Sequence, residues 1–186
     1  VFEVGVMGIA PLAAPHCTVA TPARRGPGPS SDAASYAVER ELEDLAALLT
    51  AAGGAASVFG ASSGAALGLR AAAAGLPLRK LAMYEPPFVQ EGASAREPDH
   101  IAALRQLLAR GQRGAAVKYF MQDMVHAPAA VVLMMRCVFP VWAKLKAVAH
   151  TLPYDAAIMG DWRVPVARAS EVKVPSLVLH GGKTDA

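Results

Sequence analysis

The chain has 186 residues, of which 54% are hydrophobic and 18% charged, and its formal net charge is +3. This length fits one domain, or one domain with an insertion, and the composition excludes a disordered chain. Lys and Arg are scattered among acidic residues, and no apolar run is long enough to span a bilayer. We therefore expect neither a nucleic-acid partner nor a membrane partner.

The two cysteines, Cys17 and Cys137, lie far apart in the sequence and form no C-x-x-C motif. Isolated cysteines of this kind are typical of reduced thiols that are packed in the interior of a protein. The cysteine content therefore predicts a cytoplasmic protein.

The first third of the sequence predicts a strand, a loop and a long helix. Residues 1–15 are ambiguous between strand and helix, Cys17 to Thr21 predicts a strand, and residues 22–31 form a loop rich in Gly and Pro. From about Asp32 to Ala52, apolar residues recur at helical spacing while acidic residues lie off that face. This pattern predicts an amphipathic helix, which the two following glycines end.

Residues 56–84 predict a strand, a helix and a second strand. Ala56 to Phe59 has the pattern of a buried strand, residues 64–74 that of a helix, and Leu81 to Tyr84 that of another strand. Together with the preceding strand and helix, this gives the order β-α-β-α-β with short connections. The order predicts an α/β fold with a doubly wound, mainly parallel sheet.

The turn Gly60-Ala61-Ser62-Ser63-Gly64 joins the strand to the helix and has the G-x-S-x-G pattern of a nucleophile elbow. Such a turn lifts a serine hydroxyl above a parallel sheet, and its sharpness favours Gly60 and Gly64 because they lack a Cβ atom. The N-terminus of the following helix would stabilise a developing oxyanion. The pattern predicts Ser62 as a nucleophile, and a serine/glycine turn without chemistry is the simpler alternative.

The same turn also looks like the glycine-rich turn of short-chain dehydrogenases, which holds a dinucleotide pyrophosphate. Glu85 falls roughly where a ribose-binding acid belongs. However, the third glycine of that motif is replaced by Ala66, no Tyr-x-x-x-Lys follows, and a strand and a helix precede the turn. An NAD(P)-binding oxidoreductase therefore stays an alternative to a serine enzyme.

From Phe88 to about Ala169, helical periodicity replaces the strand signals, and Pro98, Pro128 and Pro140 stand where first-turn prolines would open helices. The chain returns to strand at Val174 to His180. A helical insertion therefore interrupts the sheet. The predicted domains are residues 1–87 for the first part of the core, residues 88–169 for a helical cap, and residues 170–186 for the return to the core.

Four stretches together resemble the α/β-hydrolase family, in its small esterase/perhydrolase-like branch. They are Arg24-Arg25-Gly26, the acidic helix from Glu39 to Leu49, the elbow with the later Tyr84-Glu85-Pro86-Pro87, and Leu177 to Gly182 leading to Asp185. The resemblance implies acyl transfer through a covalent acyl-enzyme, with no cofactor. The Met, Val, Trp and Phe residues of the predicted cap suggest a small-molecule substrate that is an apolar acyl or ring-bearing compound.

The resemblance also assigns roles to particular residues. Ser62 matches the nucleophile, Asp185 the catalytic acid, and the backbone N–H of Ser63 an oxyanion donor, while Glu85 is an alternative acid. The five histidines show no metal-ligand spacing, so no metal site is predicted. His180 holds an ordinary position for the family, and the position of His100 predicts a solvated or capping residue.

Members of that family begin with further strands and a His-Gly loop, and they carry the catalytic histidine after a later strand. Here the sequence runs from Val1 to Ala186. We therefore expect a fragment of a longer hydrolase, poorly active by itself and able to self-associate through exposed sheet edges. A native protein confined to these residues would instead be a non-catalytic binding protein with the hydrolase fold.

Overall fold

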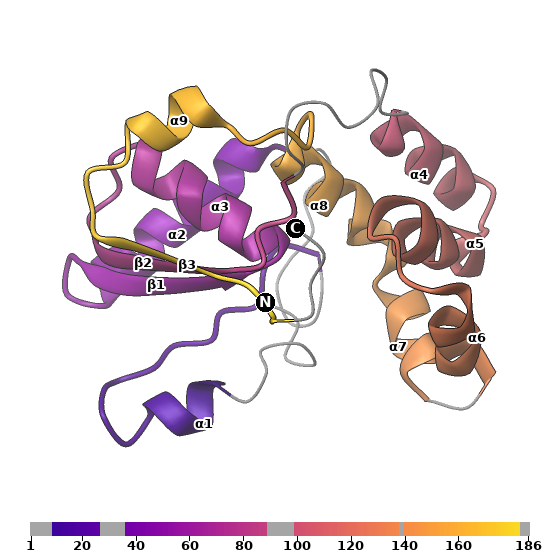
Figure 1. Ribbon diagram of the computed structural model, residues 1–186, viewed down its shortest axis with the longest axis horizontal. Helices are drawn as coiled ribbons and strands as arrows, with labels where there is room; N and C mark the ends of the chain where they lie inside the picture. The colour runs from indigo at the N-terminus through magenta and orange to yellow at the C-terminus, as the bar shows by residue number, and fades with distance from the viewer. Residues whose placement is uncertain (1–8, 27–35, 89–98, 138–139, 183–186) are drawn as a thin grey trace. The chain divides into compact units, whose positions relative to one another are not determined.

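The computed structural model describes residues 9–26, 36–88, 99–137 and 140–182 (Figure 1). Contacts between residues divide the chain into two compact units, which are residues 1–91 with 162–186 and residues 92–161. The sequence pattern placed the insertion at residues 88–169, and those domain boundaries stay a prediction.

In its described residues, the first unit is a three-stranded parallel sheet with helices packed beside it. Its strands run in the order β1-β2-β3, and α3 packs against β1 and β2 while α2 and α9 contact α3 (Figure 1). This is the α/β fold with a parallel sheet that the sequence predicts. The elements are α1 (Ile9–Ala13), α2 (Val38–Ala51), β1 (Ala56–Ala61), α3 (Ser63–Ala73), β2 (Leu78–Tyr84), α9 (Val166–Ser170) and β3 (Ser176–Leu179).

The hydrophobic core of this unit lies between α3 and the sheet, and small residues let the two approach closely. A Cβ atom added to Gly68 of α3 would lie 2.8 Å from Cδ1 of Leu81, which is 1% exposed in β2. That distance is shorter than side chains tolerate, so a residue without a side chain is needed there. The other members of the buried cluster are Leu49, Ala65, Leu69, Ala71, Ala72, Leu78 and Met83.

Two predictions, the strand at Cys17 to Thr21 and the burial of both cysteines, are wrong. Cys17 to Thr21 forms no strand, because its side chains are exposed and no described strand lies beside it to pair with its backbone groups. Both cysteines, Cys17 and Cys137, are exposed thiols, so the expectation that they are packed in the interior also fails. The helix predicted from about Asp32 begins at Val38, and residues 32–35 lie outside the described residues.

The second unit contains only helical segments in its described part, as the sequence predicts for this stretch. Within it, α4 packs against α5 and α8, and α5 packs against α7 (Figure 1). Asp99 caps α4 by accepting a hydrogen bond from the Ala102 N–H at 2.9 Å. The segments are α4 (His100–Ala109), α5 (Arg113–Tyr119), a π-helical turn η1 (Phe120–Met124), α6 (Ala129–Cys137), α7 (Val141–Ala147), a 3₁₀ turn η2 (Ala149–Thr151) and α8 (Leu152–Met159).

His100 differs from its prediction as a solvated or capping residue. It is only 5% exposed at the start of α4, and its Nδ1 lies 2.9 Å from the hydroxyl of Tyr119 in α5. The two rings meet edge to face with centroids 5.8 Å apart. Packing of α4 against α5, which the sequence around His100 does not reveal, buries the imidazole.

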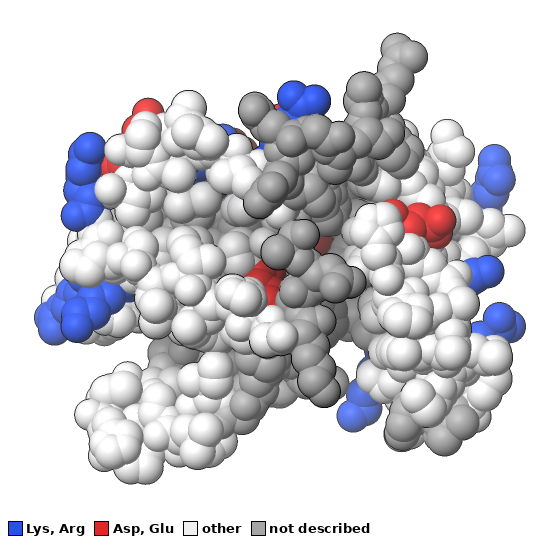
Figure 2. All heavy atoms as spheres, viewed as in Figure 1, with Lys and Arg blue, Asp and Glu red and all other residues white. Residues whose placement is uncertain are grey.

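None of the helices in the described ranges is both long and apolar enough to cross a membrane. On the face of the molecule drawn in Figure 2, described Lys and Arg side chains lie in several separate places with uncharged surface between them.

Candidate active site

Ser62 occupies a strained turn between β1 and α3. Its backbone has φ 52° and ψ −125°, a left-handed conformation that costs a residue with a side chain about 1–3 kcal/mol. The Ser62 N–H donates to the Tyr84 carbonyl of β2 at 2.9 Å, and the Ser62 carbonyl accepts from the N–H groups of Ala65 and Ala66 at 2.9 and 3.2 Å. The sheet and the helix therefore hold the turn from both sides, and the residue itself is exposed.

The two glycines of the motif are required to different degrees. A Cβ atom on Gly60 would lie 2.3 Å from the Gly64 carbonyl oxygen and 2.7 Å from the Ala65 backbone nitrogen. By contrast, a Cβ atom on Gly64 would meet nothing within 4 Å. The turn therefore excludes a side chain at position 60, as predicted, whereas the predicted steric need at position 64 is wrong because that side of the turn opens outward.

Replacement of Gly60 by alanine is expected to lower the free energy of unfolding by about 2–3 kcal/mol, because backbone atoms would have to move apart. Gly64→Ala is the matched control and is expected to leave stability unchanged or to raise it by up to about 1 kcal/mol, because alanine favours the helix. Urea denaturation followed by circular dichroism measures both. Equal stability of the two variants would contradict the close approach at Gly60.

Ser63, the first residue of α3, is hydrogen-bonded through its side chain to an arginine from a distant part of the chain. Arg24 Nη1 donates to Ser63 Oγ at 3.3 Å. Because Ser63 directly follows Ser62, Arg24 supports the residue whose backbone N–H the sequence assigns to the oxyanion. Sequence reasoning placed Arg24 in a loop but did not bring it to the elbow.

Arg24 is itself fixed by a buried carboxylate of α2. Its Nε and Nη2 donate to the two oxygens of Glu41 at 2.6 and 2.7 Å, and Glu41 is only 3% exposed. The hydroxyl of Tyr36 donates to the same carboxylate at 2.7 Å. This bidentate ion pair supplies hydrogen bonds to both oxygens of a carboxylate that would otherwise be costly to bury. In the sequence, Glu41 is one of several acidic residues off the apolar helix face, and no local pattern distinguishes it from its acidic neighbours as the buried one.

The neighbouring arginine makes a similar but more exposed ion pair. Arg25 donates from Nη2 to Asp44 at 2.7 Å, and the Asp44 side chain is 45% exposed. The hydrogen bond that Arg25 donates to Asp44 raises the pKa of Arg25 above its usual value, so the guanidinium stays charged at any physiological pH. Two adjacent arginines therefore attach the same loop to α2, one to a buried carboxylate and one to an exposed one.

Glu85, the alternative acid, directly follows β2 and has a backbone φ of 44°. Its N–H donates to the Leu179 carbonyl at 2.8 Å, and its Oε1 accepts from the Gly181 N–H at 3.0 Å. The carboxylate thus fastens the segment after β3 to the end of β2. Asp185, the acid expected from the resemblance, lies outside the described residues.

No described histidine is hydrogen-bonded to the side chain of Ser62. Ser62 Oγ makes no hydrogen bond to any residue in the described ranges, and His180 is exposed with Nδ1 3.1 Å from the Gly181 carbonyl. Among the same residues there is also no group of three His, Cys, Asp or Glu side chains that could hold a metal ion.

Comparison with known proteins gives the family. The chain matches the model of the alpha/beta hydrolase family over residues 1–186. A solved alpha/beta hydrolase from Sphaerobacter thermophilus DSM 20745 is 50% identical with a TM-score of 0.90, and the match covers 97% of this chain and 70% of that chain. No curated protein matches the chain. The chain belongs to the alpha/beta hydrolase family.

A more distant structure shares the fold alone. It is a hydrolase from Pseudomonas aeruginosa PA01, which is 24% identical with a TM-score of 0.56 over 84% of this chain and 58% of that chain. The family predicted from the elbow and its flanking segments is therefore confirmed. None of these matches supports the dehydrogenase alternative.

Proposed function

We propose that the protein is a serine hydrolase that cleaves carboxylic esters or related acyl bonds, with Ser62 as the nucleophile. The observation that carries the proposal is the strained, exposed Ser62 between β1 and α3, at the place where the family's fold presents its nucleophile. A serine with positive φ costs stability, and such strain persists at sites where the position of the side chain matters.

In the proposed reaction, Ser62 Oγ attacks the carbonyl carbon of the substrate and a tetrahedral oxyanion forms. The backbone N–H of Ser63, at the start of α3, donates to that oxyanion. A histidine oriented by the Asp185 carboxylate takes the Oγ proton and returns it to the leaving alcohol. Water then attacks the acyl-enzyme by the same route, and the acid product leaves.

The substrate that we propose is a small apolar acyl compound. The Met, Val, Trp and Phe residues in the helical stretch between positions 88 and 169 support this proposal by their apolar composition.

Covalent labelling tests the nucleophile. A fluorophosphonate probe is expected to form a phosphorus–oxygen bond to Ser62 Oγ with loss of fluoride, in the protein produced from its complete native reading frame. Tandem mass spectrometry distinguishes Ser62 from the adjacent Ser63. Labelling at Ser63, or no labelling in a folded protein that also hydrolyses no ester, would contradict the proposal.

Substitution of each candidate acid, Glu85 and Asp185, tests which of them orients the catalytic histidine. Glu85→Gln keeps an oxygen that accepts from the Gly181 N–H, so ester hydrolysis is expected to change less than about fivefold, since a neutral acceptor replaces a charged one. Asp185→Asn is expected to lower kcat by about 10⁴-fold, because the histidine loses its orienting carboxylate. Steady-state kinetics with p-nitrophenyl acetate measures both variants. A reversed order of effects would assign the acid to Glu85.

A further inference from the structure

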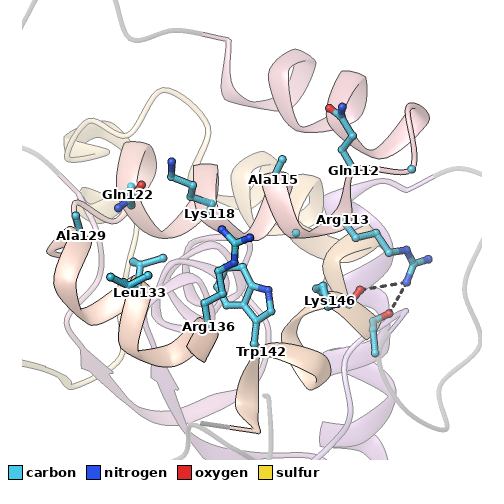
Figure 3. Close-up of a pocket in the computed structure, with 14 residues that line it drawn as sticks. Gln112, Arg113, Ala115, Lys118, Gln122, Ala129, Leu133, Arg136, Trp142 and Lys146 are labelled. Atoms are coloured by element: carbon cyan, nitrogen blue, oxygen red, sulfur yellow. Dashed lines mark hydrogen bonds between the residues drawn. The ribbon is translucent and has the colours of Figure 1, made fainter. Parts of the chain in front are cut away.

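A groove in the second unit is lined by several basic residues, and no acidic residue is among the described residues that line it. It lies between α5, α6 and α7 and has a volume of about 1150 Å³ (Figure 3). A volume of this order accommodates a drug-sized molecule. Its cationic and aromatic lining residues are Arg113, Lys118, Arg136, Lys146 and Trp142.

The four cations of the groove come from three different helices. Arg113 is held in place, because its Nη1 donates to the carbonyl oxygens of Lys146 and Ala147 at 3.2 and 2.9 Å. The side chains of Lys118, Arg136 and Lys146 make no hydrogen bond or ion pair with any residue in the described part of the chain. A cleft lined by one sign of charge raises the local concentration of ions of the opposite sign, so this groove favours an anion.

An aromatic ring lies next to the cations. Trp142 lines the groove together with Arg136 and Lys146 (Figure 3). Gly114 lies near both side chains, because an added Cβ atom would be in ordinary contact with Lys146 Cδ at 3.7 Å and with Trp142 Nε1 at 3.9 Å. An indole in a cationic groove offers a stacking partner to a ligand that carries both a flat ring and a negative charge.

We propose that this groove is a binding site for an organic anion that carries an aromatic ring. Lys118, Arg136 and Lys146 hold the anionic group, which is a carboxylate or a phosphate, and Trp142 contacts the ring. The proposal is independent of the reaction at Ser62, since every residue that carries it belongs to the second unit.

Fluorine NMR titration tests the site with probes that share one ring. The probes are 4-(trifluoromethyl)benzoate, 4-(trifluoromethyl)phenyl phosphate and the neutral 4-(trifluoromethyl)benzyl alcohol. Saturable binding of one or both anions, at least tenfold tighter than the alcohol and weakened by added salt, is expected. Tighter binding of the benzoate assigns the site to carboxylates, and tighter binding of the phosphate assigns it to phosphates. Equal binding of alcohol and anions, or no saturable binding, overturns the proposal.

Two lysines of one helix provide a matched pair of variants. Lys146 lines the groove, whereas Lys144 lies on the same α7 and is also exposed but is not among the lining residues. Lys146→Gln is expected to weaken binding of the anion about tenfold, as the loss of a hydrogen bond to a charged group does, and Lys144→Gln to leave it unchanged. Equal effects of the two would show a general attraction by surface charge and overturn the site.

Discussion

Replacement of Ser62 by alanine is expected to reduce kcat for ester hydrolysis by about 10⁴- to 10⁶-fold, in the protein produced from its complete native reading frame. The expectation follows from the proposed acyl-enzyme, which cannot form without the hydroxyl, so that only binding and oxyanion stabilisation remain. The fold should persist, since no described residue bonds the Ser62 side chain and the elbow is held by backbone hydrogen bonds. Initial rates with p-nitrophenyl acetate, together with circular dichroism, measure both properties.

The adjacent serine is the control for this substitution. Ser63→Ala removes the hydroxyl that accepts from Arg24 but keeps the backbone N–H that we propose as oxyanion donor. A loss of rate of about tenfold or less is therefore expected, which corresponds to one hydrogen bond of ordinary strength. If Ser63→Ala and Ser62→Ala lowered kcat by the same factor, or if Ser62→Ala kept its activity, the assignment of the nucleophile would be wrong.

Replacement of Arg24 by alanine is expected to lower the free energy of unfolding by about 3–5 kcal/mol. The change leaves the Glu41 carboxylate, which is 3% exposed, without the guanidinium that donates to both its oxygens. Removal of one partner from a buried ion pair costs this much because the remaining charge is not solvated. Urea denaturation at constant pH and salt measures the loss.

Arg25→Ala provides the comparison, because the next residue pairs with a carboxylate that is 45% exposed. Water solvates Asp44 when its partner is removed, so a loss of at most about 1 kcal/mol is expected. Similar losses for the two variants would show that burial of Glu41 does not determine the stability of this loop. The double variant Arg24→Ala with Glu41→Leu should recover part of the loss, since no charge is then left buried.

Local patterns predicted the central elements well, because their signals lie in consecutive residues. The apolar run before the elbow and the alanine-rich stretch after it gave β1 and α3 to within a few residues. The elbow itself was predicted from its glycines, although only Gly60 has the predicted steric reason. The family follows from the same short stretches.

Features that depend on distant residues were not predictable in this way. The segment from Cys17 to Thr21 has the composition of a strand, but a strand forms only where another one pairs with it. In the same way, the contact between Arg24 and Ser63 joins positions 39 residues apart, and His100 is buried by a helix that follows it. In each case the deciding neighbour is fixed by tertiary packing rather than by local sequence.

The close contact between Gly68 and Leu81 has a consequence for protein engineering. Because α3 begins at the elbow, a larger residue at position 68 would push the helix away from β2 and shift Ser62 and Ser63 with it. A combinatorial library that pairs Gly68→Ala with smaller residues at position 81 would therefore vary the placement of the elbow in small steps. Selection from such a library could change substrate preference while every residue of the G-x-S-x-G motif stays as it is.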